Sequence, residues 1–107
     1  MEEKDFIKYW IWLTQIPYLG SVMEGRLLAK FKSPQDIYDA DEKCLREISG
    51  ITKRQIASIL QARSFDRAEK ILEDCEKKKI YVLTKADIRY PEKAKQVKDA
   101  PSVLYYQ

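Results

Sequence analysis

The chain of 107 residues contains no histidine, and its only two cysteines, Cys44 and Cys75, lie far apart in the sequence. Structural zinc sites are usually built from closely spaced Cys and His residues, and a nucleophilic Ser or Cys usually needs a His beside it. The glycine-rich motifs that cradle nucleotide phosphates, G-x-G-x-x-G and G-x-x-x-x-G-K-[ST], are missing too. The sequence therefore predicts a non-catalytic protein that holds no metal ion and no cofactor.

Long apolar runs are also scarce. The apolar stretch at residues 9–13 is far shorter than the roughly 20 residues of a membrane-spanning helix, and the chain starts with the acidic MEEKDF rather than the basic start of a signal peptide. With 45% hydrophobic and 11% aromatic residues but only three Gly and four Pro, the composition favours a folded, helix-rich domain. We therefore expect a cytoplasmic protein with reduced cysteines and no membrane contact.

Apolar residues recur at helical spacing through most of the chain, and cap residues mark where helices begin. The first helix is expected over residues 4–15, with Trp12 partly exposed because it lies two positions from Trp10. Capping boxes are predicted at Ser21–Glu24 and Thr52–Gln55. Further helices are expected after Ser33 and Asp41 and over 66–78, and strands at 80–84 and 102–106 with a short helix at 90–97 between them. This order predicts a mainly α chain that ends in a parallel β-α-β segment.

A turn followed by a capped helix occurs twice. Aligning Ile16 with Ile48 places Leu19 on Ile51, Gly20 on Thr52, Leu27 on Ile59 and Leu28 on Leu60 without a gap. The pattern is typical of the helix-hairpin-helix motif, roughly apolar-x-Gly-apolar-Gly. A turn that glycine permits aims backbone N–H groups outward beside the positive end of a helix, and these groups can bind a phosphate. Such a contact positions nucleic acid without reading its sequence.

Each copy departs from the motif in a different half. The first has Tyr18 at the first glycine position and keeps Gly20, whereas the second keeps Gly50 and has Thr52 at the second glycine position. We therefore expect both hairpins to fold, but to bind phosphate weakly or not at all.

Charge separates the two copies. Residues 51–63 carry three basic residues and no acidic one, for +3, whereas residues 16–32 carry +2 and the connector 33–50 carries −3. The second hairpin is therefore the better DNA candidate. The predicted DNA-backbone contacts are Gly50, Ile51, Thr52, Lys53 and Arg54, followed by Leu19, Gly20 and Ser21.

The chain resembles the DprA/Smf DNA-processing proteins over essentially its whole length. The segments YWIWLTQIPYLG, KFKSPQDIYDADEKCLREISGIT and IYVLTKADIRYPEKAKQVKDAPSVLYYQ occur in the order seen in that family. The last segment is the most distinctive, although Ile88 stands where the family often has Pro. Its distinctive residues are Leu83, Thr84, Asp87, Tyr90, Pro91, Asp99, Ala100, Pro101 and the strand at 103–105.

The resemblance implies a tandem helix-hairpin-helix, SAM-like helical domain at 1–64, followed at 65–107 by a helix and the first β-α-β elements of a truncated Rossmann-like domain. It implies a cytoplasmic bacterial protein that binds incoming single-stranded DNA and helps load a RecA-type recombinase during natural transformation. Family members commonly dimerise and bind DNA chiefly through the Rossmann-like domain, so this region would supply auxiliary DNA-backbone or protein contacts.

Two other roles follow from the residues. Exposed aromatic side chains such as Trp12, Tyr18 or Tyr38, together with the acidic connector, could make the chain a protein-protein interaction module with no DNA binding of its own. The acidic residues at 36–42 could suggest a metal-dependent nuclease, but their places at the starts of short helices favour capping.

Overall fold

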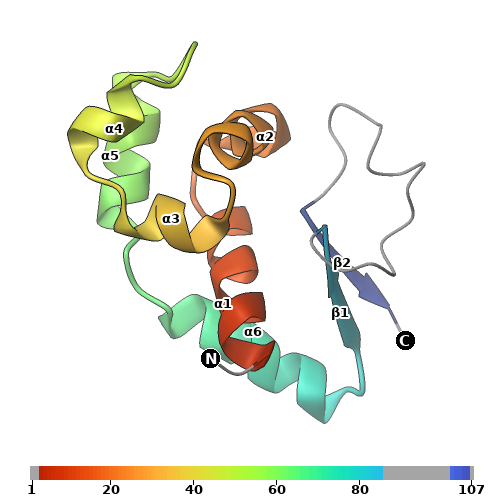
Figure 1. Cartoon of the computed structure of the whole chain (residues 1–107). Coiled ribbons are helices and arrows are strands. Elements are labelled where there is room, and N and C mark those ends of the chain that lie inside the picture. The colour runs from red at the N-terminus through yellow and green to blue at the C-terminus, as the bar shows by residue number, and fades with distance from the viewer. Residues whose placement is uncertain (1–2, 86–101, 107) are drawn as a thin grey trace.

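The computed structural model describes residues 3–85 and 102–106, and within them the fold is mainly helical (Figure 1). The elements are α1 (Glu3–Thr14), α2 (Gly20–Phe31), α3 (Pro34–Asp39), α4 (Glu42–Arg46), α5 (Lys53–Gln61), α6 (Asp66–Lys77), β1 (Tyr81–Thr84) and β2 (Val103–Tyr106). This confirms the predicted class, a mainly α chain with a small β part. The predicted helix at 90–97 lies outside the described residues.

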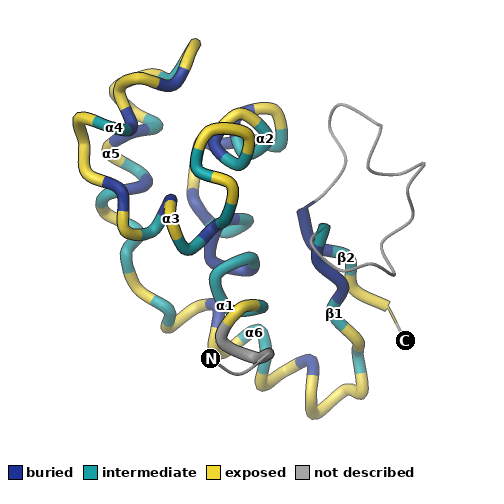
Figure 2. The backbone as a smooth tube through the Cα atoms, viewed as in Figure 1, coloured by how far each residue is buried: buried dark blue, intermediate teal, exposed yellow. Residues whose placement is uncertain are grey.

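Helix α1 lies at the centre of the fold and contacts α2, α3, α6 and both strands (Figures 1 and 2). Its Ile11 and Leu13 are completely buried, as are Leu27 of α2, Ile37 of α3 and Ile59 of α5. Burying side chains of this size from four helices supplies the main driving force for folding. The hairpin helices and their connectors therefore share one core.

Trp12 is buried rather than partly exposed, with only 3% of its surface accessible. Its indole Nε1–H donates a hydrogen bond of 2.6 Å to the carbonyl of Ala62, which follows α5. Because this bond satisfies the only polar group of the ring, the whole side chain can enter the core. The expectation of partial exposure was wrong.

An aromatic cluster fastens α1 to α3 and to the start of α6. The rings of Tyr38 and Phe65 stack with their centroids 4.6 Å apart, and Tyr9 meets both rings edge-on. Trp12 packs edge-on against Tyr38 at 4.8 Å. Of the three aromatic residues considered for docking, Trp12 and Tyr38 are thus occupied by packing, whereas Tyr18 remains 65% exposed.

Most of the predicted helix starts are confirmed. The N–H of Asp36 donates to Ser33 Oγ at 3.2 Å, and the N–H of Cys44 donates to Asp41 Oδ1 at 2.8 Å. At α5, Thr52 forms the predicted capping box with Gln55. These caps satisfy N–H groups that have no partner within the helix.

The capping box predicted at Ser21 is wrong. Helix α2 starts earlier, at Gly20, which turns the chain at φ +76°, and the N-cap residue Leu19 makes no side-chain cap hydrogen bond. Glu24 instead accepts a 3.0 Å hydrogen bond from Ser102 Oγ, just before β2. Burial raises the pKa of Glu24, although the bond from Ser102 and the charge of Lys85 oppose this. Glu24 therefore links α2 to the strand pair.

The two strands pair antiparallel, with Tyr81 opposite Tyr106 and Thr84 opposite Val103. The expected β-α-β segment requires parallel strands, so this part of the prediction is corrected. Antiparallel strands need no crossover, and the spacing of two strands along a sequence does not reveal their direction.

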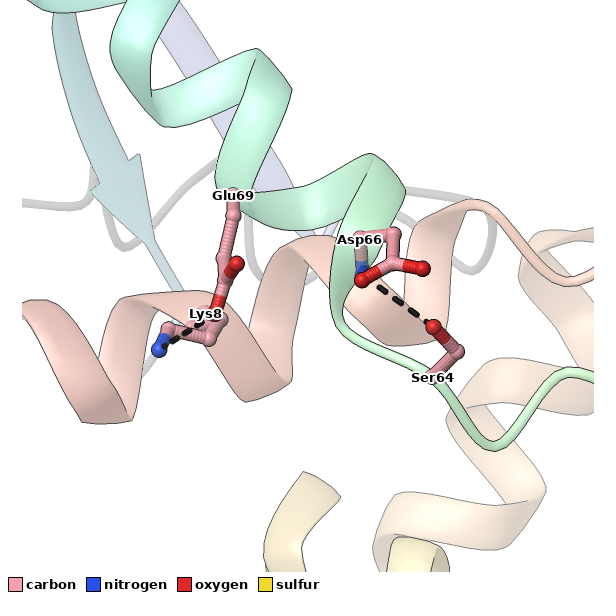
Figure 3. A network of polar contacts seen from close by, with 4 residues as sticks. All are labelled: Lys8, Ser64, Asp66 and Glu69. Carbon is pink, nitrogen blue, oxygen red and sulfur yellow. Dashed lines mark hydrogen bonds and ion pairs between the residues drawn. The ribbon is translucent and has the colours of Figure 1, made fainter.

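Helix α6 packs on α1, and Ala68 of α6 belongs to the same buried cluster as Ile11. Lys8 Nζ lies 3.2 Å from Glu69 Oε1 across the two helices, and Ser64 Oγ accepts from the N–H of Asp66 at the entry to α6 (Figure 3). The core therefore continues across the expected boundary at residue 64.

Candidate nucleic-acid interface

The two hairpin turns have the same backbone twist at equivalent positions. Tyr18 and Gly50, which the repeat aligns, both adopt left-handed conformations, with φ +66° and +79°. A left-handed conformation costs a residue with a side chain about 1–2 kcal/mol, whereas glycine adopts it freely. The second aligned pair differs, because Gly20 has φ +76° and Thr52 is extended at φ −98°. The repeat is thus retained in the backbone at the first glycine position.

Each hairpin is tied to the turn of the other. Gln55 Nε2 of α5 donates to the carbonyls of Tyr18 and Leu19 at 3.2 and 3.4 Å. Arg26 Nη1 of α2 donates to the carbonyl of Ser49 at 2.9 Å. The structure therefore brings the two groups of predicted site residues together. We call residues 18–21 and 50–54 the hairpin tips.

At the N-terminus of α5, the capping box uses the N–H groups of Thr52 and Gln55 and leaves those of Lys53 and Arg54 as donors for a ligand. The Thr52 N–H donates to Gln55 Oε1 at 3.0 Å, and the Gln55 N–H donates to Thr52 Oγ1 at 3.1 Å. The intervening N–H groups of Lys53 and Arg54 belong to the first turn, where no intrahelical acceptor exists. Both side chains are exposed beside the positive end of the helix. This end of α5 is suited to an anion.

The other predicted site residues differ in what they can contact. Gly20, Gly50 and Thr52 are exposed, and Ser21 and Ile51 are half-buried. Leu19 is only 4% exposed, so its side chain belongs to the core and its carbonyl is bound by Gln55. Any contact with DNA from these positions is therefore made mainly by the backbone.

The basic residues of the two hairpins are not equally available. Arg63 is half-buried and donates to the carbonyl of Ala40, so its charge lies in the packing rather than at a tip. Lys30 forms a 2.6 Å ion pair with Glu47. Arg26, Lys53 and Arg54 therefore supply the positive charge of the hairpin tips and their junction.

Sequence reasoning missed the roles of Arg26 and Gln55 in joining the hairpins. The signal that could have found them is the repeat itself, because in each copy a polar residue in the first two turns of the second helix can reach the opposite turn. The sequence marked Tyr18 as a departure from the motif and as an exposed aromatic residue for docking, but not as a partner of Arg54, whose guanidinium lies 4.3 Å from the centroid of its ring.

A groove of about 650 Å³ lies beside the second hairpin, between α4 and α5. Its apolar lining is formed by Ile51, Ile56, Ala57 and Leu60, and its polar lining by Glu42, Arg46, Lys53 and Gln61. Arg46 is paired with Glu42 at 3.1 Å, one turn apart on α4. The groove thus combines an apolar lining with charged groups.

Residues 3–85 and 102–106 also bear on metal binding and on membrane insertion. No group of three His, Cys, Asp or Glu side chains in these ranges is placed to hold a metal ion. None of their helices is long and apolar enough to cross a membrane.

Comparison with known proteins agrees with the hairpin architecture. Residues 13–63 match the family described as a SAM-like helix-hairpin-helix tandem. The chain is also 29% identical over 98 residues to Protein Smf of Synechocystis sp. (strain ATCC 27184 / PCC 6803 / Kazusa). This matched segment covers 92% of this chain and 25% of Protein Smf. The chain therefore spans about a quarter of the length of this curated relative. No solved structure matches this chain significantly.

Proposed function

We propose that this chain, which is similar to the N-terminal region of the DprA/Smf DNA-processing proteins, binds the sugar-phosphate backbone of DNA at its hairpin tips. The observation that carries the proposal is the junction of the tips, where Gln55 and Arg26 each hold the opposite turn beside Lys53 and Arg54. In the whole protein this contact would assist the binding of incoming single-stranded DNA and the loading of a RecA-type recombinase during natural transformation in the cytoplasm. The role is non-catalytic.

The geometry favours a weak contact without sequence preference. The N–H groups of Lys53 and Arg54 recognise a phosphate rather than a base edge. Arg26, Lys53 and Arg54 provide only a few charges, and each phosphate contact to a single strand changes the logarithm of affinity by about −0.7 per tenfold increase in salt. About three contacts give a slope near −2, which suits an auxiliary site.

Charge reversal at the second tip tests this proposal. We expect Lys53→Glu combined with Arg54→Glu to weaken binding of a fluorescent single-stranded oligonucleotide of about 20 nucleotides at least tenfold at about 50 mM salt. Lys70→Glu combined with Lys77→Glu, at exposed positions of α6, changes the net charge equally and is expected to have a smaller effect. Equal losses in the two variants would show that only net charge matters and would exclude a site at the tips.

The groove between α4 and α5 favours a second candidate function, a protein-protein contact. Its apolar lining is suited to an apolar side chain from a partner such as the recombinase. Ala57 lies in the groove and is exposed, so Ala57→Arg would fill it while keeping a good helix former. If the groove binds the recombinase, this variant of the full-length protein should lose that partner and retain DNA. Unchanged recombinase binding would rule the groove out.

A further inference from the structure

We propose that Tyr18 is a base-stacking residue, whose ring, backed by the guanidinium of Arg54, takes an unpaired nucleobase while the hairpin tips bind the neighbouring phosphates. This inference rests on the proposed DNA-backbone contact and adds a second kind of contact to it. The inference gives a role to Tyr18, which stands where the helix-hairpin-helix motif has its first glycine.

Tyr18 is the most exposed large hydrophobic side chain in the described part of the chain, at 65%. Several other aromatic rings in that part pack on one another, as Tyr38 does on Phe65 and Tyr81 does on Tyr106. The partner of Tyr18 is instead a guanidinium, 4.3 Å from the ring centroid. Its exposure leaves ring surface open to a flat ligand.

The turn holds Tyr18 in place. Its φ is +66°, its carbonyl accepts from Gln55, and the next side chain, Leu19, is anchored in the core at 4% exposure. The backbone beneath the ring is therefore fixed before any ligand arrives, which lowers the entropy cost of binding. At the equivalent position the second hairpin has Gly50, so the first hairpin has an aromatic ring where a glycine would be unstrained.

Charge favours a nucleobase over a protein side chain as the ligand. The hairpin tips contain Lys53 and Arg54 and no acidic residue, and Arg26 lies at their junction. In a DNA strand each base is flanked by backbone phosphates, so a base can lie on Tyr18 while the neighbouring phosphates meet the cations. Bases stack on aromatic rings largely without regard to sequence, and the loss of one such stack weakens binding on the order of tenfold.

Tyr18→Gly separates stacking from backbone binding. The variant gives the first turn the residue that the second turn has at Gly50, so the left-handed conformation is kept without strain. It should fold, and thermal unfolding checks this. Tyr18→Phe keeps the ring and serves as the matched control.

The two probes are a single-stranded oligonucleotide with bases and one of equal length in which all nucleotides are abasic. We expect Tyr18→Gly to lose about tenfold in affinity for the first and nothing for the second, while Tyr18→Phe matches the wild type on both. Wild-type protein that binds both probes equally, or an unchanged affinity of Tyr18→Gly for the base-bearing probe, would overturn stacking and leave backbone binding standing. If the wild type binds neither the base-bearing nor the abasic probe, both proposals are overturned.

Discussion

Gly50→Ala tests whether the second turn depends on its left-handed glycine. At φ +79°, an alanine costs about 1–2 kcal/mol, and a less flexible unfolded chain returns roughly 0.5 kcal/mol. The new β-carbon would also collide with the Arg26 guanidinium, which donates to the Ser49 carbonyl at 2.9 Å. Loss of this exposed hydrogen bond adds about 0.5–1 kcal/mol. We therefore expect a net destabilisation of about 1–2.5 kcal/mol.

Urea unfolding followed by circular dichroism measures the effect, and Gly25→Ala provides the control. Gly25 lies inside α2, and a β-carbon there would meet no atom within 4 Å. Alanine is favoured over glycine inside a helix by about 0.5–1 kcal/mol, so this variant should be more stable than the wild type. If Gly50→Ala stabilises the chain as Gly25→Ala does, the account of the turn is refuted.

Three further experiments have outcomes that follow from the structure. Trp12→Phe leaves the Ala62 carbonyl without its donor and should cost about 1–3 kcal/mol in urea unfolding, whereas no loss would contradict the 2.6 Å bond. Thr52→Ala should cost about 1 kcal/mol and Ser21→Ala almost nothing, because of these two residues only Thr52 caps a helix. Equal losses would restore the capping box predicted at Ser21. Burial raises the pKa of the Glu24 carboxyl in the folded chain above its usual 4.5. Its protonated form therefore stabilises the fold fully below pH 4.5, and this stabilisation is lost as the pH rises through the raised pKa. Glu24→Gln should then exceed the wild type in thermal stability near pH 7 and equal it below pH 4.5; a constant difference would contradict this.

The sequence predicted the features that short segments determine. A cap acts within about one turn of a helix, so Ser33, Asp41 and Thr52 could be identified from their neighbours alone. The hairpin repeat could also be recognised, because its apolar spacing and its glycines lie within single segments. Its copies then proved to share a left-handed residue at Tyr18 and Gly50.

Features that depend on distant partners could not be predicted in this way. Trp12 is buried because its indole finds the Ala62 carbonyl, fifty positions away. Glu24 turns to Ser102 near the far end of the chain instead of completing a local capping box. The direction of the strands is likewise a matter of tertiary pairing. At the candidate site, the sequence indicated which residues form each tip, but not that Gln55 and Arg26 join the two tips into one surface.

The measurement that tests the central claim most directly is the salt dependence of single-stranded DNA binding by the wild-type chain. Fluorescence anisotropy of a labelled oligonucleotide would be followed from about 50 to 200 mM salt, where phosphate contacts have large effects. The account predicts weak binding whose affinity falls with a logarithmic slope near −2, as about three phosphate contacts require. Binding that does not change with salt, or no binding even at the lowest salt, would contradict a DNA-backbone contact at the hairpin tips.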